Sequence, residues 1–251
     1  MFSVDLNSDI GESFGAYKLG DDDAILQHIT ACNVACGWHA GDPMVMDRVV
    51  RVAAERGVAV GAHPGYPDLM GFGRRVMKLS FAEAKNYVKY QLGALSAFTT
   101  TYGTKIHHCA PHGAMGNMCQ DDRDLARAIC EAVYEIDPEI IIYYCAGAVL
   151  GEEAEKIGLR AACEIFADRA YEDDLSLRSR KLEGSMITDE DVAIARCIRM
   201  IKEGKVTSYS GKELDIKGDT LCVHGDGPKA IAFVKRISEA FTKEGIEIKA
   251  F

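Results

Sequence analysis

Basic residues and long apolar runs are both scarce in this sequence. Its 29 lysines and arginines are outnumbered by 38 aspartates and glutamates, which gives a formal net charge of −9. Because nucleic acids and anionic membrane surfaces select for basic patches, we expect neither as a partner. No run of about 18 apolar residues suggests a membrane span, and the opening MFSVDLNSDIGE places acids where a secretory leader has a basic region. We therefore expect a cytoplasmic protein.

The short signatures of nucleotide and metal sites are also missing. The sequence contains no GxxxxGK[ST] phosphate loop, no HExxH helix, no paired CxxC and no EF-hand loop. Its nine cysteines are odd in number and follow no repeated spacing, which predicts reduced thiols. Cys36 and Cys109 lie near predicted strand ends, where a cysteine nucleophile is conceivable, although burial is the commoner fate of this residue. Any metal or catalytic centre must therefore be assembled from residues far apart in the chain.

The composition that remains is that of an ordinary globular protein. Hydrophobic residues make up 48% of the 251 residues and charged residues 27%, which is typical of a soluble protein with a sizeable core. No linker rich in proline, glycine or serine, no break in composition and no internal repeat divides the chain. We expect one domain over residues 1–251.

Short β-type runs alternate along the chain with longer segments of helical period, such as the apolar face of residues 122–136. Such alternation predicts a parallel sheet, and a length near 250 favours a closed (β/α) barrel over an open doubly wound sheet. The predicted strands are residues 2–6, 29–35, 58–62, 105–109, 140–144, 159–166 and 220–223. The predicted helix starts are Asp42 before Pro43 and two capping boxes, Ser80 with Glu83 and Thr188 with Asp191.

Polar residues gather just after the predicted strands, where parallel α/β folds collect their ligand groups. Four of the seven histidines follow such strands within two residues of a glycine or proline. Imidazoles and carboxylates that converge in a cleft can hold a divalent metal or exchange protons with a substrate, and otherwise they stabilise the barrel rim. A metal would rest on Asp9, His63 and His112. The full set of post-strand residues is Asn7, Asp9, Glu12, His39, Asp42, His63, Asp68, His112, His224 and Asp226.

Two further segments present basic side chains. Gly71-Phe72-Gly73 lacks the third glycine of a dinucleotide motif and is followed by Arg74 and Arg75, so we interpret it as a turn that offers cations to a carboxylate or phosphate. Residues 168–183, rich in arginine and aspartate, form the least regular stretch of the chain. We expect a loop or lid over the site there.

Several long blocks resemble the LamB/YcsF family. They are DLNSDIGESFGAYKLGDD, NVACGWHAGDP, GAHPGYPDLMGFGRR, PHGA, FADRAYE and CVHGDGP, in this order from about Asp5 to Pro228. The resemblance implies a TIM-like barrel of seven distorted strands, of the glycoside hydrolase/deacetylase type. It also implies a role in opening the lactam of 5-oxo-L-proline to L-glutamate with ATP hydrolysis, together with B and C subunits. Because the chain has no phosphate loop, we expect contact with ATP, as Mg-ATP, to be shared with those partners.

The resemblance also implies roles for individual residues. Glu12 or Asp226 would be a general base or acid, His224 a proton donor to the leaving nitrogen, and Arg74 a clamp for the substrate carboxylate. The catalytic set is Asp9, Glu12, His39, His63, His112, His224 and Asp226. The substrate-binding set is Asn7, Asp42, Asp68, Arg74 and Arg180. Asp9, His63 and His112 also resemble the metal ligands of related barrel deacetylases.

Departures from the family pattern leave alternatives open. The family usually reads Lys-Pro-His-Gly-Ala-Leu-Tyr-Asn where this chain has Ala110 and Gly116 in place of the lysine and tyrosine, and Lys181 stands where a small polar residue is usual. The alternatives are a stand-alone metal-dependent amide hydrolase or deacetylase, which would turn over without ATP, and a relative that has lost catalysis. Self-association into a homo-oligomer is a further possibility.

Overall fold

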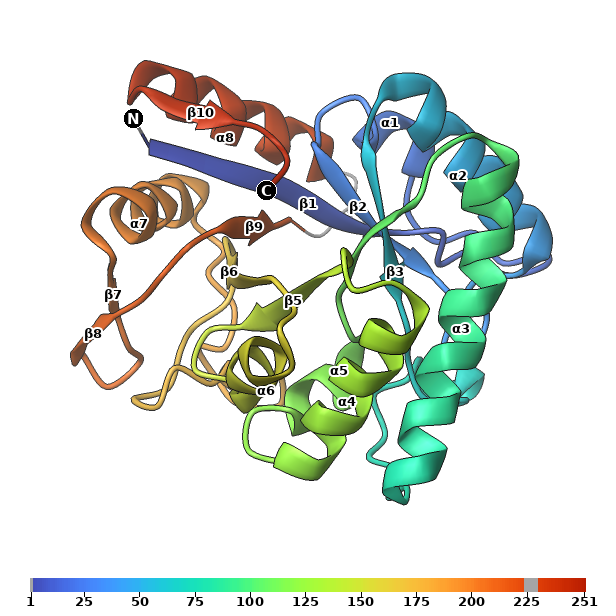
Figure 1. Ribbon diagram of the computed structural model, residues 1–251. Coiled ribbons are helices and arrows are strands. Elements are labelled where there is room, and N and C mark those ends of the chain that lie inside the picture. The colour runs from blue at the N-terminus through green and yellow to red at the C-terminus, as the bar shows by residue number, and fades with distance from the viewer. Residues whose placement is uncertain (1, 224–229) are drawn as a thin grey trace.

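The computed structural model, which describes residues 2–223 and 230–251, closes seven parallel strands into a barrel (Figure 1). The first strand closes it, because β1 pairs with β2 on one side and with β9 on the other. A short strand, β10, pairs with the start of β1 outside the ring. The barrel strands are β1 Phe2–Ile10, β2 Ala31–Ala35, β3 Ala59–His63, β4 Ile106–Cys109, β5 Ile141–Cys145, β6 Ala161–Phe166 and β9 Thr220–Cys222, with β10 at Ile246–Ile248. The predicted seven-stranded (β/α) barrel is confirmed.

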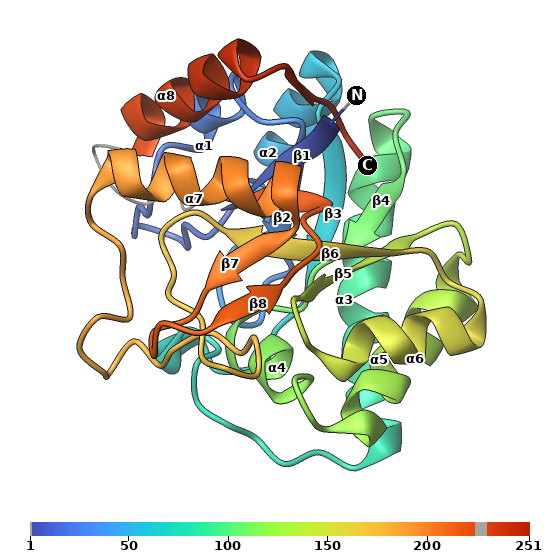
Figure 2. The ribbon, with the colours of Figure 1, turned by 90° about the vertical axis from the view of Figure 1, so that its left-hand side faces the viewer.

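Helices surround the barrel, and a small antiparallel hairpin of β7 and β8 lies beside α7 (Figure 2). The hairpin strands are β7 Lys205–Thr207 and β8 Glu213–Asp215, and a 3-10 turn, η1, spans Leu69–Gly71. The helices are α1 Asp22–Ile25, α2 Pro43–Arg56, α3 Phe81–Thr101, α4 Gly113–Met118, α5 Arg123–Ile136, α6 Val149–Ile157, α7 Glu190–Glu203 and α8 Ala230–Lys243. None of the helices in these described ranges is both long and apolar enough to cross a membrane.

The sequence signals for helix starts are confirmed in two cases and wrong in one. Asp42 caps α2 with Pro43 in its first turn, and Ser80 with Glu83 forms a capping box at α3. The predicted start at Thr188 is one residue early. Asp189 caps α7 instead, because its carboxylate accepts hydrogen bonds from two backbone N–H groups of the first turn and its charge suits the positive end of the helix dipole.

The first strand extends to Ile10, well beyond the predicted residues 2–6. Successive side chains of a strand point to opposite faces, so Val4 and Leu6 enter the hydrophobic core whereas Asp5 and Asn7 point into the barrel. The interior is polar, and the strand therefore continues without the apolar residues that would reveal it. The prediction that Asn7 and Asp9 follow the first strand is wrong: both lie within it.

A chain of hydrogen bonds runs up the barrel interior. The Thr220 hydroxyl donates to Asp5 Oδ2 (2.6 Å), and Asn7 Nδ2 donates to Thr220 Oγ1 (2.7 Å). Asn33 Nδ2 then donates both to Asn7 Oδ1 (2.8 Å) and to Asp9 Oδ1 (2.9 Å). These bonds satisfy buried polar groups, as an interior of low dielectric requires. They also fix the orientation of Asp9 at the C-terminal end of the barrel.

Candidate functional site

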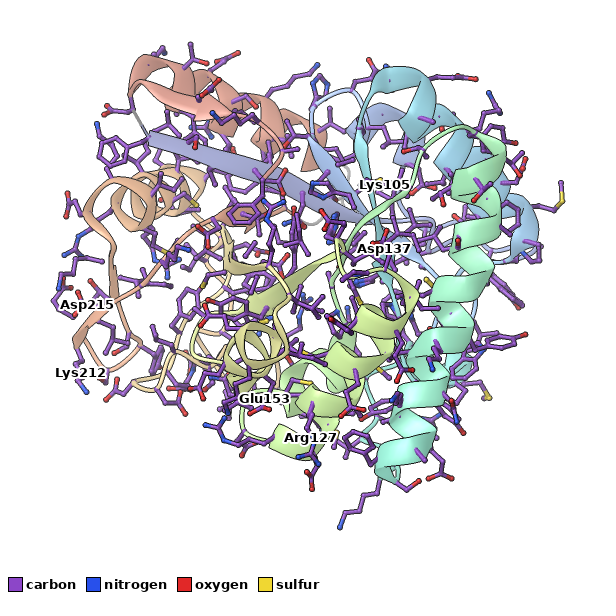
Figure 3. All side chains as sticks on the ribbon, in the orientation of Figure 1. Lys105, Arg127, Asp137, Glu153, Lys212 and Asp215 are labelled. Carbon is purple, nitrogen blue, oxygen red and sulfur yellow. The ribbon has the colours of Figure 1, made fainter. Side chains whose placement is uncertain are left out.

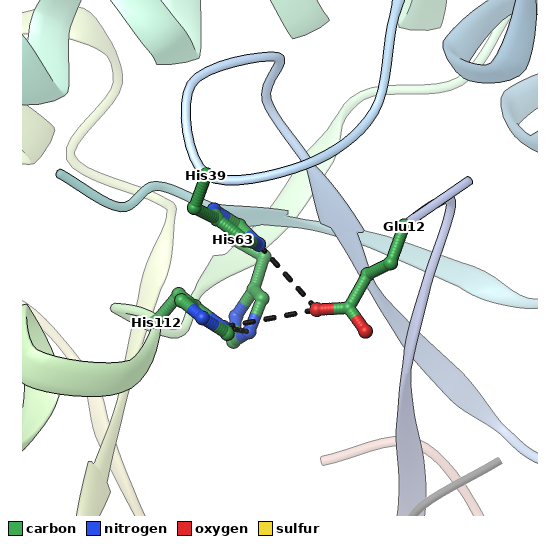
Figure 4. Close-up of side chains that lie close together, drawn as sticks. All are labelled: Glu12, His39, His63 and His112. Atoms are coloured by element: carbon green, nitrogen blue, oxygen red, sulfur yellow. Dashed lines mark hydrogen bonds and ion pairs between the residues drawn. The ribbon is translucent and has the colours of Figure 1, made fainter. Parts of the chain in front are cut away.

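Three histidines and a glutamate converge at the C-terminal ends of the barrel strands (Figure 4). His63 is the last residue of β3, His39 follows β2, Glu12 follows β1, and His112 follows β4 as the residue before α4. One possible ligand atom from each of the four lies within 4.8 Å of the others. The post-strand positions picked out in the sequence are thus brought together here by the closure of the barrel.

The imidazole rings pack directly on one another. The rings of His39 and His112 are stacked with centroids 3.6 Å apart, and His63 meets both edge-on. Glu12 Oε1 lies 3.4 Å from His39 Nε2 and 3.8 Å from His112 Nδ1. Asp9 Oδ1 lies 3.4 Å from His63 Nε2. The cluster therefore combines three imidazoles with two carboxylates.

Gly73 allows the backbone to approach the stacked rings. Its φ of +62° is in the left-handed region, and a Cβ atom there would lie 2.8 Å from His112 Cδ2 and from His39 Cβ. Neither the backbone conformation nor the space suits another residue. The glycine read in the sequence as part of a cation-bearing turn thus also closes one side of the cluster.

Backbone carbonyls determine which ring nitrogens carry protons. His63 Nδ1 lies 2.6 Å from the Ala110 carbonyl oxygen, and His112 Nε2 lies 2.8 Å from that of Phe72. A carbonyl oxygen only accepts, so both of these nitrogens are donors. The remaining nitrogens, His63 Nε2 and His112 Nδ1, face each other at 2.9 Å. Two lone pairs do not face each other at that distance, so a proton or another cation must lie at this contact.

The electrostatic environment places that proton on His63. Burial lowers the pKa of His63, but the neighbouring Asp9 carboxylate, with Glu12 and the hydrogen bond to Ala110, outweighs burial and raises the pKa to about 9. Burial, reinforced by the charge on His63, lowers the pKa of His112 to about 3. Burial also holds the pKa of His39 well below its usual range. Without a metal, the cluster at neutral pH therefore contains one imidazolium and two neutral imidazoles.

The same four side chains fit a divalent metal ion. Both ring nitrogens of His39 are buried and make no hydrogen bond with the described residues, although Glu12 lies at ion-pair distance. A buried nitrogen without a hydrogen bond is costly unless it serves as a ligand. Three imidazoles and a carboxylate are a donor set that zinc and similar ions accept, and the carbonyls of Phe72 and Ala110 orient two of the rings. The sequence named His63 and His112 for this role. The sequence analysis added Asp9 as the third ligand, whereas in the structure the side chains that cluster with these two histidines are Glu12 and His39.

A cavity of about 420 Å³ opens beside the cluster. Asp9, His63 and His112 form part of its wall, whereas Glu12 and His39 lie outside that wall. The irregular segment after β6 forms the facing wall with residues that include Ser179, Arg180 and Lys181. The predicted loop beside the site is therefore present.

The structure separates the predicted substrate-binding residues into two groups. Arg74 and Arg180 line the cavity. Asp42 instead caps α2 and accepts from the Gly15 N–H (2.8 Å), Asp68 pairs with Arg75 and caps η1, and Asn7 is buried in the barrel interior. These three side chains hold structure together rather than line the cavity. His224 and Asp226 lie outside the described residues.

The departures from the family pattern fall on the cavity wall. Ala110, Gly116 and Lys181 all line it. A Cβ atom on Gly116 would lie 2.4 Å from the Pro111 carbonyl oxygen, so a larger residue there requires the backbone just before His112 to move. The glycine is therefore matched to its local backbone.

The wall also contains polar residues that were not among the predicted site residues, and three of them stand out. Glu164 and Tyr143 lie inside predicted strands, at positions that point into the barrel, and Arg169 follows β6. Alternation along β5 and β6 is the signal that could have identified the first two. The thiol of Cys36, considered as a nucleophile, is buried, and burial raises its pKa to about 12. Cys109 is buried as well.

Comparison with known proteins gives matches that span the chain. The model of the LamB/YcsF family matches residues 4–251. The chain is 58% identical over 250 residues to the A subunit of the 5-oxoprolinase of Campylobacter jejuni, covering 100% of this chain and 98% of that protein. The solved lactam utilization protein of Thermus thermophilus superposes with a TM-score of 0.93 at 46% identity, covering 99% of this chain and 100% of that one.

A more distant likeness concerns the fold alone. The family 4 carbohydrate esterase of Streptomyces lividans superposes with a TM-score of 0.50 at 12% identity, covering 98% of this chain and 91% of that one. The predicted resemblance and the predicted type of barrel are both confirmed by these comparisons.

Proposed function

Since the chain belongs to the LamB/YcsF family, we propose that it acts as the A subunit of an ATP-dependent 5-oxoprolinase. In this role it hydrolyses the lactam of 5-oxo-L-proline to L-glutamate, together with B and C subunits, as a single-domain cytoplasmic protein. The observation that carries the proposal is the cluster of three histidines and two carboxylates beside the cavity. Its residues can supply and accept protons at one end of a bound substrate.

Amide hydrolysis needs a base for the attacking water, stabilisation of the developing oxyanion and a proton for the leaving nitrogen. Asp9 lines the cavity and is oriented by Asn33, so we assign it the role of the general base that takes a proton from the attacking water. In the cluster without a metal ion, His63 carries a proton and also lines the cavity, which suits it to donate to a developing negative charge. Arg74 would hold the substrate carboxylate.

Glu12 and His39 lie behind the residues of the wall, and we assign them to holding His112 and a metal ion in position. A divalent ion bound by the four clustered residues would take the place of the His63 proton, and it would then polarise the substrate carbonyl or lower the pKa of a water molecule. His224 and Asp226 remain proposed catalytic residues on the strength of the family resemblance, outside the described residues.

The need for ATP follows from the chemistry of the lactam. A five-membered lactam is a poor electrophile, and conversion of its oxygen into a phosphate ester would activate the carbonyl. Because the chain contains no phosphate loop, we assign the binding of Mg-ATP to an arrangement shared with the partner subunits.

The test measures 5-oxoproline-dependent release of ADP and L-glutamate by the chain alone and with B and C subunits. We expect turnover only in the complete mixture, and we expect Asp9→Asn to lower it by about 10²-fold to 10⁴-fold. His28→Gln is the matched control, because His28 lies outside the cluster. Full turnover by the Asp9 variant, or no turnover in any mixture, would contradict the proposal.

A second candidate is a stand-alone metal-dependent amide hydrolase. The observation that favours it is that neither buried nitrogen of His39 makes a hydrogen bond with the described residues, because a metal ion would engage one of the two. It predicts one bound divalent ion and hydrolysis of an amide substrate without ATP. Metal analysis alone does not separate the two functions, whereas turnover in the absence of both ATP and partners does.

A further inference from the structure

The cavity wall has a positive balance of charge, in contrast to the chain as a whole. Among residues 2–223 and 230–251, four basic side chains and two carboxylates line it, although the formal net charge of the protein is −9. A positive cleft in an acidic protein concentrates anionic ligands locally. The basic residues are Arg74, Arg169, Arg180 and Lys181, and the carboxylates are Asp9 and Glu164.

The basic residues belong to two walls on different sides of the barrel. Arg74 follows β3 and lies over the ring of Phe72, which itself contacts His112. The other three belong to the segment after β6. In the barrel, β3 and β6 are separated by two strands in one direction and three in the other. The cavity therefore offers cations at two separate positions, one beside the histidine cluster and one facing it.

Arg169 is the buried member of the facing group. Its side chain is only 8% exposed, and one terminal nitrogen, Nη2, donates to the Arg178 carbonyl oxygen (2.7 Å). Its Nε is also buried and has no hydrogen-bond partner within residues 2–223 and 230–251. A buried guanidinium N–H without an acceptor costs free energy. An anion in the cavity, which Arg169 lines, would offset the charge of this buried guanidinium.

The segment that carries these cations is held in place by hydrogen bonds. Arg178 N donates to the Ala170 carbonyl oxygen (2.9 Å), and Ile187 N donates to that of Asp168 (2.8 Å). Arg196 Nη1, from α7, donates to the carbonyl oxygen of Arg169 itself (3.3 Å). A binding position fixed in this way loses less entropy on binding than one on a loose loop.

We propose that Arg169, Arg180 and Lys181 form an oxyanion subsite that binds a phosphoryl group on the substrate. Three cations suit a phosphoryl dianion better than a single carboxylate, which one arginine satisfies with two parallel hydrogen bonds. The inference rests on the proposed function and specifies its substrate. The ligand carries two anionic groups, a carboxylate held by Arg74 and a phosphoryl group held by the segment after β6.

Binding of inorganic phosphate to the full chain tests the subsite directly. The titration is performed by calorimetry with a chelator present, so that phosphate held by a metal ion is not counted. We expect Lys181→Gln and Arg169→Lys each to weaken phosphate binding by about tenfold. Lys181 is exposed and its replacement leaves the core intact, so it decides the matter if the Arg169 variant fails to fold. Lys212→Gln, in the hairpin at the edge of the molecule, is the matched control and should change nothing (Figure 3).

A second arm uses 5-oxo-L-proline, which carries a carboxylate and no phosphoryl group. We expect Arg74→Gln to weaken its binding and Lys181→Gln to leave it unchanged. The subsite is overturned if the protein does not bind phosphate, or if neither Lys181→Gln nor Arg169→Lys weakens that binding. Equal weakening of phosphate and 5-oxoproline by Lys181→Gln also overturns it, because one shared anion position would then serve both. Loss of lactam turnover with phosphate selectivity intact counts only against the proposed function.

Discussion

His63 Nε2 and His112 Nδ1 face each other at 2.9 Å, while the opposite nitrogen of each ring donates to a backbone carbonyl. A neutral imidazole has one N–H group, and in each ring that group already donates to the backbone. Two neutral rings therefore have no proton left for the contact between them. The contact is therefore complete only with an additional proton or with a metal ion, and the two states exclude each other at His63. This exclusion determines how the cluster responds to metals.

Zinc is expected to bind at the cluster and to raise the melting temperature of the protein. An ion that binds only the folded state stabilises it by RT ln(1 + [L]/Kd), or about 2.7 kcal/mol at a concentration of 100 Kd. We expect His39→Ala to abolish the shift, because it removes a ligand that makes no other hydrogen bond with the described residues. Thermal unfolding with and without Zn²⁺ measures this. A shift as large in the His39 variant as in the parent protein would exclude the cluster as the site.

Tyr143→Phe is expected to destabilise the barrel by about 1–3 kcal/mol. The Tyr143 hydroxyl donates to Asp5 Oδ2 (3.0 Å), and Asp5 is buried, so the variant removes one of the donors that offset the burial of that carboxyl group. Tyr90→Phe is the matched control, since Tyr90 is 67% exposed. Urea unfolding gives the free energies. Equal stability of the two variants would show that the interior hydrogen bond contributes nothing.

Gly116→Ala is expected to destabilise the protein although alanine is the better helix former. Its Cβ atom would meet the Pro111 carbonyl oxygen at 2.4 Å, and the backbone would have to move. Gly93→Ala, within α3, meets nothing within 4 Å and should be neutral or stabilising by up to about 1 kcal/mol. Denaturant unfolding of the two variants measures the difference. A stabilised Gly116 variant would mean that this backbone yields easily.

The Asp68–Arg75 pair is expected to make stability depend on acid pH. Hydrogen bonds from Arg75 and from the Gly71 N–H lower the pKa of Asp68 to about 2, below its value in the unfolded chain. The stabilisation is therefore complete above the unfolded pKa and is lost as the pH falls towards 2. Asp68→Asn should be less stable than the parent protein at pH 7, and the gap should close towards pH 2.

Unfolding in urea at several pH values tests this dependence. Asp121→Asn serves as the control, because Asp121 is exposed and makes no ion pair with any residue in the described ranges. A gap between the Asp68 variant and the parent protein that is independent of pH would contradict the assignment.

The strands that the sequence predicted well are those with apolar residues on both faces. Residues 140–144 form a continuous apolar run, residues 159–166 are mostly apolar, and β5 and β6 lie within one or two residues of these segments. Beyond Leu6 the first strand was missed, because its inward side chains are Asn7 and Asp9. A polar barrel interior removes the hydropathy signal on that face, so only tertiary structure reveals the strand.

The sequence was sufficient to predict where the candidate site lies, but not what each of its residues does. Strand-end position identified His39, His63 and His112, because parallel strands bring those ends together. The same rule selected Asp42 and Asp68, which cap helical turns, because a capping carboxylate and a ligand carboxylate occupy the same kind of position in sequence. Distinguishing them requires the distances of the folded chain.

The hydrogen bonds inside the barrel connect the floor of the barrel, at Asp5, with the histidine cluster at the C-terminal ends of the strands. From Asp5 they pass through Thr220, Asn7 and Asn33 to Asp9, which lies 3.4 Å from the ring of His63. A substitution at the far end of this relay would alter the basicity of the cluster without touching the cavity. We therefore expect changes at the floor of the barrel, acting through the orientation of Asp9, to shift the acidity of the cluster at its mouth.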